Sequence, residues 1–200
     1  MKKIALFIVC FWGSIVYAQD TTKEVSALEY QQNLNKEFAN PDESPLTSSD
    51  LKSFSGLDFY PIDDTYKVTA HFKRTENEAI FKMKTSTSRL PEYRKYGEIS
   101  FELLGKTFQL NLYQNIELSQ KKGFEDYLFL PFSDESCGQE TYIGGRYIDL
   151  NIPTSDTIVI DFNKAYNPYC AYNHKYSCPR VPLENDLKIA ILAGVKKFHD

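Results

Sequence analysis

The sequence predicts a mainly β fold, an antiparallel sandwich or a partly open barrel of about eight strands with a short N-terminal helical arm. Residues 98–113 alternate apolar and polar side chains about a glycine, as a β-hairpin does. Short runs rich in β-branched and aromatic residues follow at 127–132 and 157–160, and from residue 59 onward the pattern is that of strands. The chain shows no internal repeat, no low-complexity tract and no second domain.

Residues 1–18 have the pattern of a secretory signal peptide. Lys2 and Lys3 form a basic start, residues 4–16 are apolar, and small residues precede a cleavage position before Gln19. The apolar run is short for a membrane span. We therefore expect a periplasmic or secreted protein with no integral membrane span after the signal peptide is cleaved.

The mature chain is expected to comprise a helical arm and linker at residues 19–50 and a β-rich domain at residues 51–200. Apolar side chains at helical spacing predict one helix, with Ser26 as its N-cap. The side chains that share the helix face are Ala27, Tyr30, Leu34 and Phe38. A second short helix is expected to start at Ser48 or Ser49 and to end at Ser53.

The charge balance excludes some partners. The chain has 23 Lys and Arg residues against 27 Asp and Glu residues, a net charge of −4 at pH 7, and removal of the signal peptide makes the charge more negative. An acidic surface without basic clusters argues against nucleic acid and anionic membranes as partners.

Two short strands and a hairpin are expected in the first half of the domain. Residues 66–72 alternate, and residues 79–83 form another short run. With Gly105 and Lys106 in a two-residue turn, apolar side chains of the hairpin face apolar ones and polar face polar. The predicted pairs are Leu103–Phe108, Phe101–Leu110, Ile99–Leu112, Glu102–Gln109 and Ser100–Asn111.

A second hairpin is predicted over residues 140–149, about Gly144 and Gly145. Its register would place Tyr142 opposite Tyr147 and Glu140 opposite Asp149. Two facing carboxylates destabilise a hairpin. Either the register differs, or a cation or a proton lies between the two groups. Residues 179–183 are then an extended connector, and residues 187–192 are the last strand.

The loop after the strand at 157–160 is the centre of the functional interpretation. Its sequence, DFNKAYNPYCAY at 161–172, is rich in Asn, Asp and Tyr, and Pro168 excludes a helix through it. One interpretation is an ordered loop whose amides cap its own backbone. The other is a binding site for a small polar or sugar-like ligand, since loops on rigid strands commonly carry function.

Several blocks of the chain resemble one family of exported bacterial proteins. The blocks are GLDFYPID (56–63), YRKYGEISFELLGKTFQLNLY (93–113), ETYIGGRY, DFNKAYNPYCAY and SCPRVPLEN. Together they resemble the domain of unknown function 1684 family from about residue 51 to residue 194. The resemblance implies membership and no particular activity. Val195 stands where the family pattern has Glu, so an acidic role at this position is excluded.

Three cysteines remain after cleavage: Cys137, Cys170 and Cys178. An oxidising compartment favours a Cys170–Cys178 disulfide that closes a nine-residue loop. The alternatives are free thiols or a metal site formed with His174, for which no fourth ligand is evident. We assign no metal site.

No standard catalytic motif is present, and the sequence assigns neither a catalytic residue nor a cofactor. The first hypothesis is a domain that binds a small-molecule ligand or a periplasmic protein, with Arg146 bonded to Asp161 or Asn163. The alternative is a hydrolase-like enzyme that uses a carboxylate cluster, with Glu140, Asp149 or Asp161 as acid or base, either with or without the assistance of a metal ion. The candidate binding residues are Glu140, Tyr142, Arg146, Tyr147, Asp161, Asn163, Tyr166 and Asn167.

Overall fold

The computed structural model describes residues 25–199, so the predicted signal peptide lies outside the described residues. The helices are α1 (Ala27–Ala39) and α2 (Ser48–Ser53). The strands are β1 (Lys67–Arg74), β2 (Phe81–Lys82), β3 (Glu92–Leu103), β4 (Lys106–Asn115), β5 (Tyr127–Asp134), β6 (Arg146–Asn151), β7 (Thr157–Asp161) and β8 (Asp186–Leu187). The short 3₁₀ turns are η1 (Asp64–Tyr66), η2 (Leu118–Gln120), η3 (Phe162–Lys164), η4 (Tyr169–Ala171) and η5 (Leu183–Asn185).

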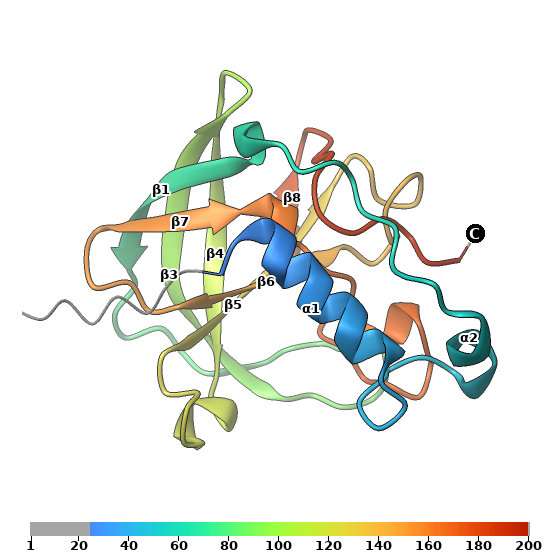
Figure 1. The fold of residues 1–200 in the computed structure, drawn as a ribbon. Coiled ribbons are helices and arrows are strands. Elements are labelled where there is room, and N and C mark those ends of the chain that lie inside the picture. Colours follow the sequence, from blue (N-terminus) through green and yellow to red (C-terminus); the bar gives the residue numbers. More distant parts are fainter. Residues whose placement is uncertain (1–24, 200) are drawn as a thin grey trace, which may run out of the picture.

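One sheet organises the molecule. Its main strand order is β6-β5-β4-β3-β1-β7, with β2 added beside β3 and β8 beside β5. All pairings are antiparallel except the short one between β5 and β8. The sheet curls into a half-barrel, and α1 runs across its open side (Figure 1). The predicted mainly β fold with a helical arm is therefore confirmed.

The concave face of the sheet holds the main core. Alternate side chains of β3, β4, β5 and β7 point into it because successive residues of a strand face opposite sides. Its fully buried members include Ile99, Leu110, Leu112, Leu128, Leu130 and Ile160. A second, aromatic cluster covers part of the opposite face. It comprises Met83, Tyr93, Tyr113, Phe129 and Tyr147.

The helical arm agrees with the prediction. The Ser26 side chain accepts a hydrogen bond from the Glu29 amide at 3.2 Å and caps α1. Phe38 near the other end of α1 is buried in a third cluster with Tyr172 and Val195. The arm thus lies on the domain. No helix among residues 25–199 is long and apolar enough to cross a membrane.

The first hairpin is confirmed, but its predicted register is wrong by two residues. Ile99 lies opposite Leu110 and Phe101 opposite Phe108, because the turn comprises Leu104 and Gly105 instead of Gly105 and Lys106. Both turn residues have positive φ, 50° and 74°, as the hairpin turn that matches strand twist requires. A shift of two keeps each side chain on its face, so the apolar sorting survives.

The predicted second hairpin is wrong. Residues 140–145 form turns around a single bridge between Thr141 and Cys137. The strand β6 pairs with β5, which places Asp149 opposite Phe129. Gly145 has φ of +83°, and a Cβ there would lie 2.6 Å from the Phe132 carbonyl oxygen. The double glycine therefore lets the chain turn tightly against β5 instead of forming a hairpin of its own. Glu140 and Asp149 consequently do not face one another.

The last predicted strand, at 187–192, is reduced to the two residues of β8. The amide of Ile191 donates to the Asp134 side chain at 3.2 Å instead of to a neighbouring strand. The Asp134 side chain thus accepts the hydrogen bond that the backbone of a neighbouring strand would accept if the strand continued to residue 191.

Candidate functional site

The outer face of β5 and β6 forms the floor of a cavity. Because β5 and β6 pair in register, Tyr127 and Phe129 of β5 share a face with Tyr147 and Asp149 of β6. Residues of α1 cover this floor. The cavity between them has a volume of about 660 Å³, within the range of small-molecule sites.

The segment after β7 closes one side of the cavity. Tyr166 pairs with Tyr147: the Tyr147 amide donates to the Tyr166 carbonyl at 2.9 Å, and the Tyr166 amide donates back at 3.0 Å. The two rings stand nearly perpendicular, with centroids 5.8 Å apart. Pro168 and Tyr169 continue this wall.

Aromatic rings and carboxylates dominate the lining. The aromatic lining residues are Tyr30, Tyr93, Phe124, Tyr127, Phe129, Tyr147, Tyr166 and Tyr169. Among residues 25–199, the charged residues that line the cavity are Glu37 and Asp149, and no Lys, Arg or His lines it. The Glu37 carboxylate accepts a hydrogen bond from the Tyr169 hydroxyl at 2.5 Å. The cavity is therefore aromatic and negatively charged.

Asp149 is the polar centre of the site. Its Oδ1 accepts hydrogen bonds from the hydroxyls of Tyr127 and Tyr166, each at 2.7 Å. Its side chain is reached by solvent through the cavity, although protein surrounds it on the other sides. This burial raises the pKa of the Asp149 carboxyl, and the two tyrosine hydrogen bonds act in the opposite direction.

The tyrosines around Asp149 are fixed as hydrogen-bond donors. Burial raises the pKa of Tyr127 and of Tyr166 above the ordinary tyrosine value, and the negative charge of Asp149 raises both further. The phenols therefore keep their protons at neutral pH. Two donors converge on one carboxylate oxygen, and Oδ2 has no hydrogen bond to any of residues 25–199.

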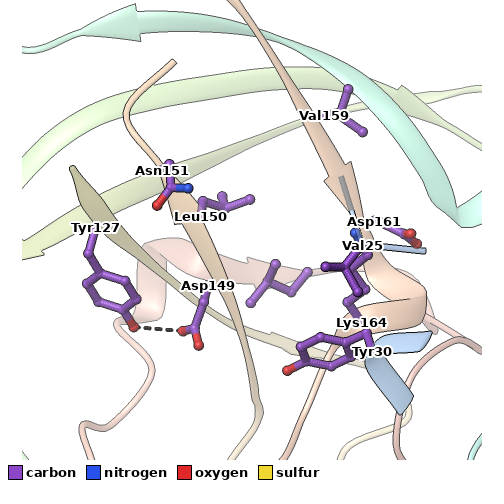
Figure 2. Close-up of a pocket in the computed structure, with 10 residues that line it drawn as sticks. Val25, Tyr30, Tyr127, Asp149, Leu150, Asn151, Val159, Asp161 and Lys164 are labelled. Atoms are coloured by element: carbon purple, nitrogen blue, oxygen red, sulfur yellow. Dashed lines mark hydrogen bonds between the residues drawn. The ribbon is translucent and has the colours of Figure 1, made fainter. Parts of the chain in front are cut away.

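A second cavity, of about 480 Å³, adjoins the first and shares Tyr30, Tyr127 and Asp149 with it. Figure 2 shows Tyr127 and Asp149 on one side and Tyr30, Lys164 and Asp161 on the other. Asp149 therefore lies where the two cavities meet.

Three of the predicted binding residues line these cavities. Tyr147 and Tyr166 line the aromatic cavity, and Asp161 lines the adjoining one. Asp161 Oδ1 also accepts from the backbone and side-chain nitrogens of Asn163, at 3.1 and 2.9 Å, which caps η3. The loop and the β6 segment thus lie side by side, as predicted.

Arg146 does not belong to this site, and its expected bond to Asp161 or Asn163 is wrong. The guanidinium is fully buried, and its Nη2 forms an ion pair with Asp134 at 2.8 Å. Nη2 also donates to the Ile191 carbonyl at 2.8 Å, and Nη1 donates to the Ala193 carbonyl. Arg146 therefore fastens the C-terminal segment to β5 and β6, because Asp134 and these carbonyls meet it in the interior.

The other amide and acidic candidates make structural hydrogen bonds. The Asn163 side chain accepts a hydrogen bond from the Asp63 backbone N–H at 3.0 Å and donates one to the Asp63 carbonyl at 2.9 Å. Asn167 Nδ2 donates to the Lys196 carbonyl at 2.9 Å. Glu140 accepts from the Tyr60 hydroxyl at 3.1 Å. These contacts favour a structural role for the loop amides, but Asn163 and Asn167 bond other segments of the chain and not the loop's own backbone.

Tyr142 lies with Cys170 and Cys178 at a third cavity, of about 360 Å³. Cys137, Cys170 and Cys178 are free thiols in the structure. Cys178 Sγ accepts from the Cys170 amide at 3.2 Å, so the last two cysteines are neighbours and their disulfide stays a prediction. The side-chain hydrogen bond between them lowers the pKa of Cys170 and raises that of Cys178. Among residues 25–199, no three His, Cys, Asp or Glu side chains are placed to hold a metal ion.

Sequence reasoning did not select Tyr30, Tyr93, Tyr127 or Phe129, and it considered Asp149 as one of two facing carboxylates and as an acid or base of a hydrolase. A signal was present in β5, where Tyr127 and Phe129 alternate with core leucines. The β5–β6 register was needed to place these rings beside Asp149, and that register depends on tertiary contacts.

Comparisons with known proteins agree with the fold and name no ligand. A family model described as "Protein of unknown function (DUF1684)" matches residues 52–196. The solution NMR structure of an uncharacterised protein from Haloarcula marismortui is similar, with 32% sequence identity and a TM-score of 0.65. The match covers 83% of this chain and 89% of that chain. No curated protein matches the chain.

Proposed function

Since this chain belongs to the DUF1684 family, whose description assigns no activity, we propose from its own site that it is a binding protein for a small polar ligand. The ligand occupies the aromatic cavity between α1 and the outer face of β5 and β6. The two candidate segments of the sequence contribute Tyr147 and Tyr166. A protein partner fits this site less well, because the polar groups converge inside a concavity.

One observation carries the proposal: Asp149 Oδ1 accepts two tyrosine hydroxyls at 2.7 Å, while the carboxylate remains open to the cavity. Among residues 25–199, the two acidic side chains that are buried, Asp134 and Asp161, are used by the fold. Asp134 pairs with Arg146, and Asp161 caps η3. A carboxylate that is oriented by two donors and still presents an oxygen to a cavity is arranged for a ligand.

The signal-peptide pattern at residues 1–18 supports export, so we place this binding in the periplasm or outside the cell. The mass of the secreted protein tests this placement: export predicts a chain that begins at Gln19. A mass that includes residues 1–18 in the soluble exported fraction contradicts it.

Hydrolysis was the alternative, motivated by facing carboxylates. Glu140 bonds Tyr60, and Asp149 bonds Tyr127 and Tyr166, so the facing pair is not formed. Asp149 and Asp161 remain as candidate acids or bases at the cavities, and burial raises the pKa of Asp149. The described contacts of Asp149 are hydrogen bonds from two phenols, and this arrangement favours binding over hydrolysis.

Two tryptophan variants on neighbouring positions of α1 test the cavity. Asn33 lines the cavity, and Asn33→Trp is expected to fill part of it. Gln32 is exposed and does not line it, so Gln32→Trp is the matched control. A ligand found by native mass spectrometry or by a thermal-shift library screen should bind the parent and Gln32→Trp but not Asn33→Trp. Equal binding to all three proteins contradicts the proposal.

A further inference from the structure

We propose that the ligand of the aromatic cavity is an organic cation, a compound with an ammonium group on an apolar body. This inference rests on the proposed function and adds its chemical class. The positive group lies between the Asp149 carboxylate and the surrounding tyrosine rings.

The arrangement of charge is the first support. The charged residues that line the cavity, Glu37 and Asp149, are both acidic. Elsewhere the chain supplies its own cations to such groups: Asp134 has Arg146, and Glu98 has Lys95. Asp149 forms no ion pair among residues 25–199. Its described polar partners are tyrosine hydroxyls, which are neutral.

The neighbouring groups do not remove this charge. Tyr30 and Tyr93 also line the cavity, and burial raises the pKa of each, so both stay neutral. Lys164 lines the adjoining cavity. The influences on the pKa of Asp149 are its burial and the hydrogen bonds from Tyr127 and Tyr166. The site therefore keeps a net negative charge that a bound cation would compensate.

The arrangement of the rings is the second support. Phe129 and Tyr147 meet edge to face, with centroids 4.6 Å apart at 74°, and Tyr147 and Tyr166 meet at 88°. These three rings line the same cavity and contact one another at steep angles. Aromatic rings attract cations through their negative faces, and boxes of such rings bind ammonium groups.

The alternatives fit less well. An anion would be repelled by Glu37 and Asp149. A neutral ligand would displace water from the Asp149 carboxylate without compensating its charge, which is costly. An ammonium N–H can donate to Oδ2, the oxygen that the tyrosine hydroxyls leave open, in a charge-assisted hydrogen bond.

Three compounds with one body and different charge test the class. 2-Phenylethylamine is a cation, 2-phenylethanol is neutral and phenylacetate is an anion at pH 7. Isothermal titration calorimetry of the mature chain should show the amine binding at least about tenfold more tightly than the other two, as expected for a charge-assisted contact. Asp149→Asn should remove this preference, whereas Asp156→Asn, at an exposed position outside the cavity, should keep it.

The outcomes separate this inference from the proposed function. If the alcohol or the acid binds as tightly as the amine and Asn33→Trp abolishes that binding, the cavity is a binding site and the cation assignment is wrong. If the amine binds equally well to the parent and to Asp149→Asn, the assignment is also wrong. If none of the three binds at millimolar concentration while another ligand occupies the cavity, the cation class is again rejected.

Discussion

Tyr147 and Tyr166 exchange both of their backbone hydrogen bonds, at 2.9 and 3.0 Å, from segments that lie on either side of β7 in the chain. This single bridge joins the start of β6 to the loop after β7, which are at opposite ends of the main strand order. It brings the loop's tyrosine hydroxyl to Asp149 on the face of β6. The Tyr147–Tyr166 bridge thereby closes one side of the cavity.

Asp149→Asn is expected to stabilise the unliganded protein at neutral pH. Burial raises the pKa of Asp149 in the folded state, so ionisation costs stability above that pKa, and the cost disappears as the pH falls toward the ordinary value of 3.8. The Asn side chain still offers an oxygen to the two tyrosines. The rise in Tm should be no more than a few degrees because water reaches the group.

Thermal unfolding at pH 7 and at pH 3.5 measures this effect. The gain should be present at pH 7 and nearly absent at pH 3.5, and exposed Asp156→Asn should change little at either pH. A loss of stability in Asp149→Asn at pH 7 would show that the carboxylate stabilises the fold instead of serving a ligand.

Tyr127→Phe and Tyr166→Phe should each raise the pKa of Asp149. Each variant removes one hydroxyl that donates to Oδ1 at 2.7 Å and favours the ionised form. An NMR titration of the side-chain carboxyl carbon measures the pKa. Tyr93→Phe is the control, because Tyr93 lines the cavity and its hydroxyl does not bond Asp149. An unchanged pKa in both test variants would contradict the described geometry.

Arg146→Met should destabilise the fold by about 3–5 kcal/mol, the usual cost when one partner of a buried pair is removed. It leaves the Asp134 carboxylate buried and takes donors from the carbonyls of Ile191 and Ala193. Urea unfolding at pH 7 measures the loss. Lys95→Met, which breaks the partly exposed pair with Glu98, should cost about 0–1 kcal/mol. Similar losses in the two variants would refute the structural role of Arg146.

Gly145→Ala should be more damaging than Gly105→Ala. Both glycines have positive φ, +83° and +74°, so each alanine carries a strain of about 1–2 kcal/mol. Only at Gly145 would the new Cβ meet other atoms, 2.6 Å from the Phe132 carbonyl oxygen and from a Val181 methyl group. The additional loss should be about 1–3 kcal/mol in urea unfolding. Equal losses would mean that the turn can move away from β5.

Exported protein should contain a Cys170–Cys178 disulfide, with Cys137 as its free thiol. The Cys170 amide already lies 3.2 Å from Cys178 Sγ, and an oxidising compartment favours the bond. Thiol labelling of denatured protein with mass spectrometry counts the free cysteines. Reduction should cost about 2.5 kcal/mol for a loop of nine residues. Three labelled cysteines in exported protein would show that the pair stays reduced.

Local patterns predicted the elements well where alternation or capping decided them. The Ser26 cap, the short helix at 48–53 and the strand at 157–160 depend on neighbouring residues, and the structure has all three. The hairpin at 98–113 was right in its faces and wrong by two in its register, since turns at 104–105 and at 105–106 sort the side chains equally.

The candidate site was predicted only in part. The approach of the β6 segment to the loop after β7 was expected, and Tyr147 and Tyr166 confirm it. The role given to Arg146 was wrong, because its partners come from Asp134 and from a C-terminal segment that no local pattern connects to it. The carboxylate that does face the cavity, Asp149, was considered beside the wrong partner.

The sequence by itself determined the β-rich class, the helical arm and the family, because periodicity, caps and motif blocks are properties of short segments. Only the tertiary structure decided which of many tyrosines and carboxylates share one space. A strand presents two faces, and its neighbours in the sheet determine what each face meets. Here the pairing of β5 with β6 and the bridge from Tyr147 to Tyr166 place two hydroxyls on Asp149.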